Sequence, residues 1–148
     1  MRVLILIILF VLHSPSSHAA LGGAPSDLEV KNSTRKAQSL ASVAHQNYRV
    51  NDSILSSGTM VHEYISSRNV VFAVSWNGPF LPDLQTLLGK YFDTMVAEAG
   101  KQPRAGRSQL RVSRPDVSIF SGGHMRAYEG RAWVVSEFPA GFNVSDIQ

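Results

Sequence analysis

The sequence predicts an α+β domain in which an antiparallel sheet of about five strands packs against one long amphipathic helix. Two neighbouring patterns lead to this prediction. Between Val70 and Trp76, apolar residues recur at every second position, which places Val70, Phe72, Val74 and Trp76 on one face of a strand. From Asp83 to Ala99, large apolar residues recur at helical spacing and form one broad stripe, made of Leu84, Leu87, Leu88, Tyr91, Phe92, Met95 and Ala99.

The limits of the long helix follow from its end residues. Pro82 suits the start of a helix, and the Asp83 carboxylate can accept hydrogen bonds from the free amides of the first turn. Gly100 can adopt the left-handed conformation that ends a helix. Gly89, inside the pattern, costs a helix about 1 kcal/mol and permits close approach of another backbone. Burial of the stripe is expected to contribute on the order of 10 kcal/mol before conformational entropy is subtracted.

The remaining strands are predicted from shorter alternating runs. Runs near Tyr48 to Ile54 and Met60 to Ile65 precede the Val70 strand with short connections, which predicts a meander. A C-terminal hairpin is expected from Val117 to Val135, with Gly122-Gly123 as its turn and Gly130 as a bulge in the return strand. A weaker N-terminal helix is expected to begin at Ser26, where Glu29 completes a capping box, and to include Leu40, Val43 and Ala44.

The first residues predict export. Arg2 precedes an uninterrupted apolar run from Val3 to Leu12, and a small-residue site follows, the layout of a secretory signal peptide. The run is about half the roughly 20 residues of a membrane span, so an uncleaved anchor is the less favoured alternative. Cleavage is expected after Ala19. Residues 1–19 are then the signal peptide, and residues 20–148 form a single periplasmic or secreted domain with no transmembrane segment. The sequence has no cysteine, which excludes disulfides, thiol chemistry and a lipoprotein anchor.

The basic charge is concentrated in residues 100–115, which we expect to be an exposed linker within the domain. Without Arg2 the chain carries 13 basic and 11 acidic residues, and no acid lies between Glu98 and Asp116. Long-range attraction would bring such a segment to an anionic partner. A solvated loop is the favoured interpretation, because charge runs usually form one. The segment lacks interleaved aromatic residues, so no nucleic acid partner is expected.

Few residues offer catalytic or metal chemistry. Only His45, His62 and His124 follow the predicted cleavage site, and no pair has a metal-binding spacing such as His-Glu-x-x-His. Ser121 lies near His124, but no third orienting group is identifiable and no Gly-x-Ser-x-Gly elbow is present. The sequence therefore predicts no catalytic, cofactor-binding or metal-binding residue, and no cofactor.

The best candidate for a ligand surface is the C-terminal hairpin. In an ideal strand His124, Arg126 and Tyr128 point to one side, offering a hydrogen-bonding ring, a cation and an aromatic face, while Met125 and Ala127 face the core. A solvated polar face is the plainer alternative. Two further residues complete the candidate surface, Trp76 as a groove-lining or core ring and His62 as a strand histidine.

Seven short motifs are spread over the chain after the predicted cleavage site. They are Leu21-Gly22-Gly23-Ala24-Pro25, Ser57-Gly58-Thr59, Glu63-Tyr64, Phe72-Ala73-Val74-Ser75-Trp76-Asn77-Gly78-Pro79, Pro82-Asp83-Leu84, Leu88-Gly89-Lys90-Tyr91-Phe92 and Ser121-Gly122-Gly123-His124-Met125-Arg126-Ala127-Tyr128. In these motifs the chain resembles the small exported bacterial proteins grouped as domain of unknown function family 2844, and the resemblance covers nearly the whole mature chain. It implies an exported single-domain protein and no activity, so no catalytic residue is carried over.

Three functions remain open from the sequence. The leading hypothesis is a non-enzymatic periplasmic or secreted accessory protein that binds a protein or a small molecule. The second is a small hydrolase- or lyase-type enzyme that uses His124 or His62. The third is a binder of the cell envelope or of an anionic polymer through the segment from Arg104 to Arg114.

Overall fold

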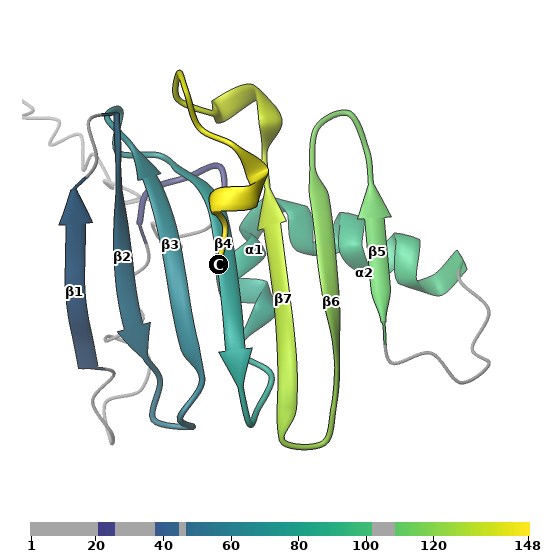
Figure 1. The fold of residues 1–148 in the computed structure, drawn as a ribbon. Helices are drawn as coiled ribbons and strands as arrows, with labels where there is room; N and C mark the ends of the chain where they lie inside the picture. Colours follow the sequence, from purple (N-terminus) through teal and green to yellow (C-terminus); the bar gives the residue numbers. More distant parts are fainter. Residues whose placement is uncertain (1–20, 26–37, 45–46, 102–108) are drawn as a thin grey trace, which may run out of the picture.

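The computed structural model describes residues 21–25, 38–44, 47–101 and 109–148, with the backbone alone for 38–44. In this part of the chain one antiparallel sheet has seven strands in the order β1-β2-β3-β4-β7-β6-β5 (Figure 1). The strands are β1 (Gln38–Ala44), β2 (Tyr48–Ile54), β3 (Met60–Ser66), β4 (Val71–Gly78), β5 (Leu110–Ser113), β6 (Ser118–His124) and β7 (Ala127–Trp133).

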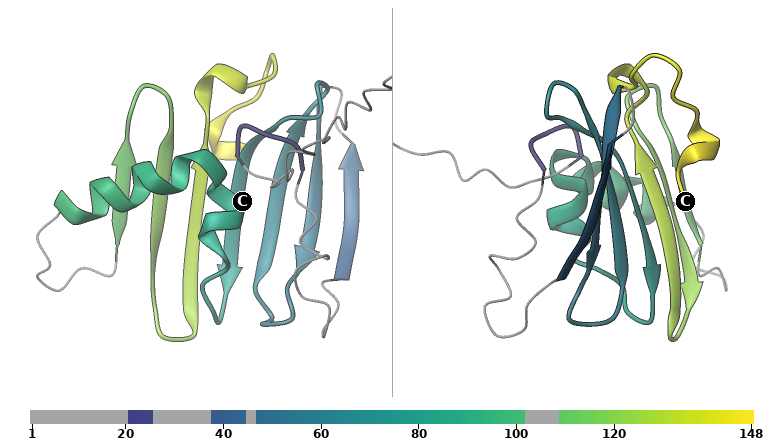
Figure 2. Two further views of the ribbon diagram at one scale, coloured as in Figure 1. Left: turned by 180° about the vertical axis from the view of Figure 1, so that it is seen from behind. Right: turned by 60° about the vertical axis from the view of Figure 1, so that its left-hand side comes forward.

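The two faces of the sheet are covered differently. The helices α1 (Leu84–Leu88) and α2 (Phe92–Lys101), joined by the short η1 (Gly89–Tyr91), lie on one face, where α2 crosses β7, β6 and β5 (Figure 2). The C-terminal segment after β7 folds onto the opposite face and contains the single turns η2 (Val135–Glu137) and η3 (Val144–Asp146). We call the face opposite α1 and α2 the helix-free face.

The α+β class, the meander and the C-terminal hairpin are confirmed, but the strand count and the N-terminal helix are wrong. The hairpin joins the meander through β7, which pairs with β4. Residues 26–37 lie outside the described part of the chain. The second half of the expected helix, with Leu40, Val43 and Ala44, is strand β1, because pairing with β2 satisfies backbone groups at the edge of the sheet.

The expected basic linker at 100–115 is also partly secondary structure. Gly100 and Lys101 continue α2, Leu110–Ser113 forms edge strand β5, and residues 102–108 lie outside the described chain. The strand forms because Leu110 and Val112 alternate with the polar Arg111 and Ser113, and both apolar side chains pack against the core under the helix layer. The run is only four residues long and lies among arginines, so the alternation was not recognised.

The long helix is present but bent. The Asp83 side chain accepts a hydrogen bond from the Thr86 amide at 3.2 Å, as expected for an N-cap. Gly89 has a φ of 50°, so the α-helix stops there and restarts at Phe92 after one tighter turn. Gly89 is therefore a helix break rather than an interior residue.

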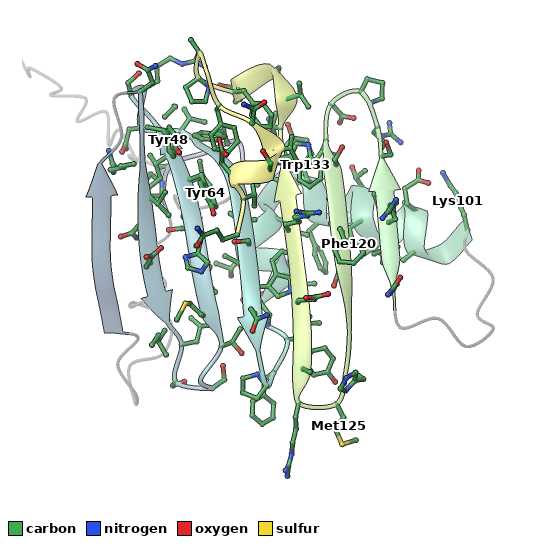
Figure 3. The ribbon with its side chains drawn as sticks, in the orientation of Figure 1. Tyr48, Tyr64, Lys101, Phe120, Met125 and Trp133 are labelled. Carbon is green, nitrogen blue, oxygen red and sulfur yellow. The ribbon has the colours of Figure 1, made fainter. Side chains whose placement is uncertain are left out.

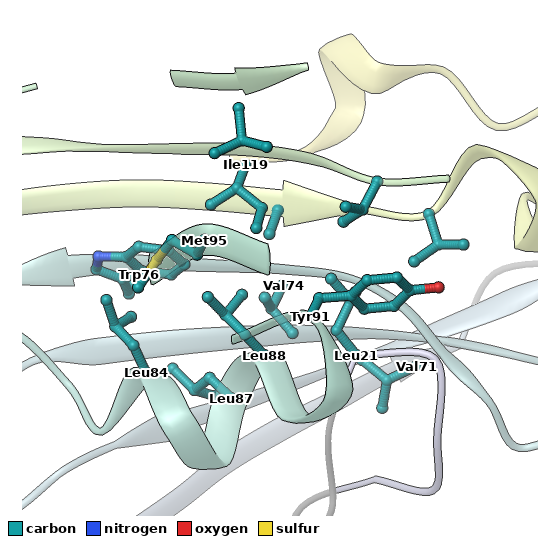
Figure 4. Packing of buried hydrophobic residues seen from close by; sticks show 14 of the residues in the cluster. Leu21, Val71, Val74, Trp76, Leu84, Leu87, Leu88, Tyr91, Met95 and Ile119 are labelled. Atoms are coloured by element: carbon teal, nitrogen blue, oxygen red, sulfur yellow. The ribbon is translucent and has the colours of Figure 1, made fainter. Parts of the chain in front are cut away.

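Five of the seven residues of the predicted apolar stripe, from Leu84 to Met95, are buried against the sheet (Figure 4), whereas Phe92 is half-buried and Ala99 is exposed. The described part of the chain places Leu87 and Leu88 at 1% and 0% exposure, and Met95 at 8%. At about 1.5 to 3 kcal/mol for each large side chain, this contact is the main source of apolar stabilisation for the helix layer. The buried residues of this core are Leu21, Val61, Ile65, Val71, Val74, Trp76, Leu84, Leu87, Leu88, Tyr91, Met95, Val112, Val117, Ile119, Ala132 and Val134.

A register shift in β4 moves Phe72 to the helix-free face. Tyr64 pairs with Ala73 and Ile65 pairs with Val71, so Phe72 is the extra residue of a bulge. The prediction that Phe72 shares a face with Val74 and Trp76 is therefore wrong. The ring of Phe72 instead packs against the C-terminal segment, with ring centroids 4.7 Å from Phe142 and 5.8 Å from Phe138.

Gly130 accommodates the indole of Trp76 and forms no bulge. The strand β7 pairs with β4 and β6 without a register shift, and Trp76 pairs directly with Gly130. A Cβ atom at position 130 would lie 2.1 Å from Trp76 Cζ2. Glycine is therefore required here because the buried indole of Trp76 occupies the space of its missing side chain.

We expect Gly130→Ala to lower the free energy of unfolding by about 2 to 3 kcal/mol, because overpacking a buried contact forces backbone and side-chain shifts. Gly100→Ala is the matched control, since a Cβ there meets no atom within 4 Å. In helix α2 it should be neutral or stabilising by about 0.5 kcal/mol. Urea denaturation followed by circular dichroism measures both. Equal stabilities of the two variants would contradict the packing role of Gly130.

Candidate ligand-binding site

The predicted candidate surface is not a continuous one. His124 lies at the end of β6, and Arg126 lies in the exposed two-residue turn that follows, with a φ of 68°. His124 pairs with Ala127, whereas Tyr128 pairs with Gly123 one position further along the ladder. Because neighbouring positions of a ladder face opposite sides, His124 and Tyr128 do not share a face.

The hairpin turn falls later in the sequence than expected. Gly122 and Gly123 are still in β6, and the turn is formed by Met125 and Arg126. Met125 is 82% exposed and Ala127 is exposed, so the expectation that they face the core is wrong. Gly123 is needed for another reason, since its φ is 124° and a Cβ there would lie 2.2 Å from the Ala127 carbonyl oxygen.

The other two predicted residues lie in the sheet. Trp76 is 2% exposed and belongs to the core under the helices. His62 lies on β3 and pairs with Ser75 of β4 on one side and Asp52 of β2 on the other. His62 is thus the predicted residue that the structure places among polar side chains on the helix-free face.

A single cross-strand row runs over the helix-free face. Successive pairings place its members opposite one another on six neighbouring strands, and Phe120 is labelled in Figure 3. Directly opposed side chains of a row lie close enough to interact. The members, from β2 to β5, are Asp52, His62, Ser75, Arg131, Phe120 and Arg111.

At one end of the row, His62 and Asp52 form a close pair. His62 Nδ1 lies 2.6 Å from Asp52 Oδ1, and the side chains are 17% and 25% exposed. The carboxylate fixes the orientation of the imidazole, as it does in general acid–base sites. Ser75 lies next to His62, but it is 2% exposed and its hydroxyl oxygen has no hydrogen-bond partner in the described chain. A covered hydroxyl that does not contact the imidazole is not an activated nucleophile.

Beyond Ser75 the row enters a groove of about 330 Å³ over the last three strands, which we call the β5–β7 groove. The groove contains two guanidinium groups, two aromatic rings and two hydroxyl groups. It is lined by Arg111, Val112, Ser113, Ser118, Ile119, Phe120, Arg131 and Trp133. This mixture of apolar surface with a few converging polar groups is typical of small-molecule sites.

Both arginines of the β5–β7 groove lie over aromatic rings. The Arg131 guanidinium carbon is 5.8 Å from the Trp133 ring centroid, and that of Arg111 is 5.9 Å from the Phe120 ring centroid. These are cation–π distances. Arg114, three residues after Arg111, forms ion pairs with Glu98 and Asp116, each at 3.4 Å. Glu98 has a lowered pKa because Lys101 donates a hydrogen bond to it, and Arg114 adds to the effect.

A second groove of about 280 Å³ adjoins the first one and shares Phe120 and Arg131 with it. We call it the C-terminal groove, because the last two residues of the chain form part of its wall. It is lined by Trp76, Asn77, Phe120, Glu129, Gly130, Arg131, Ile147 and Gln148. The two grooves together give the helix-free face a continuous concave region at β5, β6 and β7.

The end of the chain is fixed by Tyr64, which is labelled in Figure 3. The Gln148 amide donates a hydrogen bond of 2.9 Å to the Tyr64 hydroxyl, which in turn donates to the Asp146 carbonyl at 3.4 Å. Ile147 between them is 3% exposed. Burial raises the pKa of Tyr64 above its usual 10.0. This contact holds one wall of the C-terminal groove in place.

Phe120, Arg131 and Trp133 were not predicted as site residues. The sequence contains one indication of them, because Arg131 and Trp133 are two residues apart and so share a face of a strand. A bulge was expected at Gly130, and it would have interrupted the strand alternation that places Arg131 and Trp133 on one face. Their partners Phe120 and Arg111 come from other strands, and the cross-strand register that joins them is not readable from local patterns.

Within the part of the chain that the structure describes, no three or more His, Asp or Glu side chains are grouped so that they could hold a metal ion. Among the described helices, none combines the length and the apolar character that a membrane crossing requires.

A comparison with protein families found one match. The model of the family described as "Protein of unknown function (DUF2844)" matches residues 17–147. Comparisons with curated proteins and with solved structures found no match.

We expect the stability of the protein to fall as pH rises above about 10, and Tyr64→Phe to reduce this fall. The pKa of Tyr64 is raised in the folded state, so folding favours the protonated phenol and its contribution is fully present below the unfolded value of 10.0. It is lost as the pH rises through the folded value. Urea midpoints on both sides of pH 10 measure the effect, with Tyr128→Phe as control. An equally steep fall in Tyr64→Phe would refute the assignment.

The contact between Asp52 and His62 is expected to contribute about 1 kcal/mol of coupling energy at neutral pH, because both side chains are partly shielded from solvent. A double-mutant cycle with Asp52→Ala, His62→Ala and the double variant measures it by urea denaturation. Purely additive effects would show that the short distance contributes nothing to stability.

Proposed function

We propose that this chain, which belongs to the family described as "Protein of unknown function (DUF2844)", is an exported bacterial accessory protein that binds a ligand on the helix-free face of its sheet and performs no catalysis. The observation that carries the proposal is the pair of adjoining grooves that share Phe120 and Arg131. Their combined size lies within the usual range of small-molecule sites.

The position of the grooves supports binding rather than catalysis. The site offers cations and aromatic surfaces, which recognise a ligand by charge and shape. The closest acid–base pair, Asp52 and His62, lies outside the residues that line either groove. A bound molecule in the β5–β7 groove would therefore contact recognition groups and not the imidazole.

Export is supported by the order of segments at the N-terminus. The apolar run from Val3 to Leu12 and the small residues that follow have the layout of a cleavable signal peptide. The family match begins at residue 17, two residues before the expected end of the signal peptide at Ala19. This agreement favours a mature domain that starts at Ala20.

A hydrolase- or lyase-type activity is the second candidate, and the pair of Asp52 and His62 is the observation that favours it. An imidazole oriented by a carboxylate at 2.6 Å is a feasible general base. The burial of Ser75 counts against acyl transfer. His124, the other candidate for this role, lies exposed at the hairpin end, where its Nδ1 is 3.3 Å from the Met125 carbonyl oxygen.

The third candidate is a protein that binds an anionic polymer or the cell envelope through the segment from Arg104 to Arg114. The arginines of this segment have different surroundings. Arg111 lines the β5–β7 groove, whereas Arg114 is paired with Glu98 and Asp116. Arg104 and Arg107 lie outside the described residues. The part of this hypothesis that we retain is the contribution of Arg111 to the groove.

The proposal is tested by screening the purified protein against a small-fragment library by NMR. We expect hits to shift amide resonances of β5, β6 and β7, and to be lost in Phe120→Ala and Trp133→Ala, because these rings form the apolar surface of the β5–β7 groove. Met125→Ala, at the exposed hairpin turn, is the matched control and should retain binding. Hits confined to other surfaces would overturn the site.

Two further readouts separate the candidates. Mature protein recovered from the periplasm or the medium should begin at Ala20, and a cytoplasmic chain that retains residues 1–19 would contradict export. A panel of hydrolase and lyase substrates should show no turnover. Turnover that disappears in His62→Ala would replace the binding function with the second candidate.

A further inference from the structure

Exposed apolar side chains are concentrated at one end of the sheet. In the part of the chain that the structure describes, five large hydrophobic side chains are exposed, and three of them lie in the connections that follow β4 and precede β7. They are Phe80 at 59%, Leu81 at 48% and Met125 at 82% exposure, and we call these three residues the apolar tip. Clustered apolar side chains on a surface mark a contact with another molecule or a membrane, whereas isolated ones need no explanation.

The register of the sheet places the two connections next to each other. Gly78, the last residue of β4, pairs with Tyr128 of β7. Phe80 follows Gly78 by two residues and Arg126 precedes Tyr128 by two, so both connections extend beyond the same end of neighbouring strands (Figure 1). Met125, labelled in Figure 3, points away from the strands at this end. The apolar tip is therefore one projecting surface.

The exposure of Phe80 is fixed by the fold. Thr59 is fully buried, and its hydroxyl donates to the Phe80 carbonyl oxygen at 2.6 Å and accepts from the Phe80 amide at 3.3 Å. Pro79 and Pro82 restrict the backbone on either side of the exposed pair, and Pro82 is itself buried. The connection is thus held at three points while its two largest side chains are left in solvent.

The charge at this end of the sheet is positive. Its connections contain one charged residue, the exposed Arg126, which directly follows Met125. The Asp83 carboxylate, after the second connection, accepts hydrogen bonds from the Thr86 amide and hydroxyl at the start of α1. Glu129 lies further into β7 and lines the C-terminal groove. The connections are residues 55–59, 79–82 and 125–126.

A lipid bilayer fits this arrangement better than a protein partner does. A stable protein interface needs roughly 800 Å² of complementary surface on each partner, and three side chains at the ends of two turns are too few for that. A bilayer needs no complementary shape, because apolar side chains enter below the headgroups while a neighbouring arginine extends to the lipid phosphates. The positive charge of the arginine also matches an anionic membrane surface.

We propose that the apolar tip docks the protein on an anionic phospholipid membrane, with Phe80, Leu81 and Met125 inserted below the headgroups and Arg126 paired with lipid phosphates. This contact is separate from the grooves of the proposed function. A protein docked by this end of its sheet keeps both grooves open to solvent, so membrane attachment and ligand binding are compatible.

The test is flotation of the mature protein, recovered from the periplasm or the medium, with vesicles of phosphatidylcholine alone or of equal parts phosphatidylcholine and phosphatidylglycerol. The recovered protein is used because an apolar run such as Val3 to Leu12 would itself bind lipid. Binding to the mixed vesicles is expected and should weaken as salt is raised, since ions screen the attraction between the arginine and the phosphates.

Variants of the tip should separate insertion from charge. Phe80→Ala and Met125→Ala should each lower the partition coefficient on mixed vesicles roughly tenfold, because each removes a large inserted side chain. Arg126→Gln should lower it about fivefold on mixed vesicles and leave binding to phosphatidylcholine alone unchanged.

The other two exposed hydrophobic side chains of the described residues are the matched controls. Val96 on α2 is 50% exposed, and Val135 in η2, after the opposite end of β7, is 54% exposed. Val96→Ala and Val135→Ala should bind mixed vesicles as the unchanged protein does. Urea denaturation of all variants checks that folding is equal.

Two outcomes would overturn the proposal. The first is vesicle binding that is absent at low salt or that the two control variants reduce as much as the tip variants do. The second is self-association of the protein that Phe80→Ala abolishes, without vesicle binding, which would assign the apolar tip to a contact between copies of the chain. Fragment binding in the grooves is measured separately and is expected to be unchanged in every tip variant.

Discussion

The ladder between β4 and β7, where the Trp76 indole packs against Gly130, joins the two halves of the sheet. The meander of β1 to β4 and the later strands β5 to β7 meet at one ladder, between β4 and β7. At this ladder the Trp76 indole lies where a side chain of residue 130 would be, under the helix layer. Because the cross-strand row continues over the same ladder, the distance between the Asp52–His62 pair and the grooves also depends on this packing.

The two faces of the sheet are covered by different kinds of side chain. The helices bury the leucines, Met95 and Tyr91 on one face, and this apolar area provides most of the driving force that the described residues show for the helix layer. The other face keeps polar and aromatic side chains accessible at β5 to β7, and the C-terminal segment covers its upper part through Phe138 and Phe142. A ligand can therefore reach the grooves without disturbing the main core.

Local patterns were sufficient for the fold class and insufficient for the site. The helical stripe ending at Met95, the cap at Asp83 and the meander were all predicted, because each depends on residues close in sequence. The bulge that turns the Phe72 side chain to the helix-free face depends on pairing with β3. The need for glycine at position 130 depends on the Trp76 indole, which comes from another strand. The groove residues Arg111, Phe120 and Arg131 meet through register between strands, which a local pattern does not encode.

The shortness of β5 has a consequence for contacts between molecules. This strand has four residues, Leu110 to Ser113, pairs with β6 on one side and forms the edge of the sheet on the other, with Arg111 within it and Arg114 directly after it. Short, charged edges are poor templates for strand addition by another molecule. Arg111, which lines the β5–β7 groove, thus also protects the sheet against intermolecular aggregation in a chain that has no cysteine to form a disulfide.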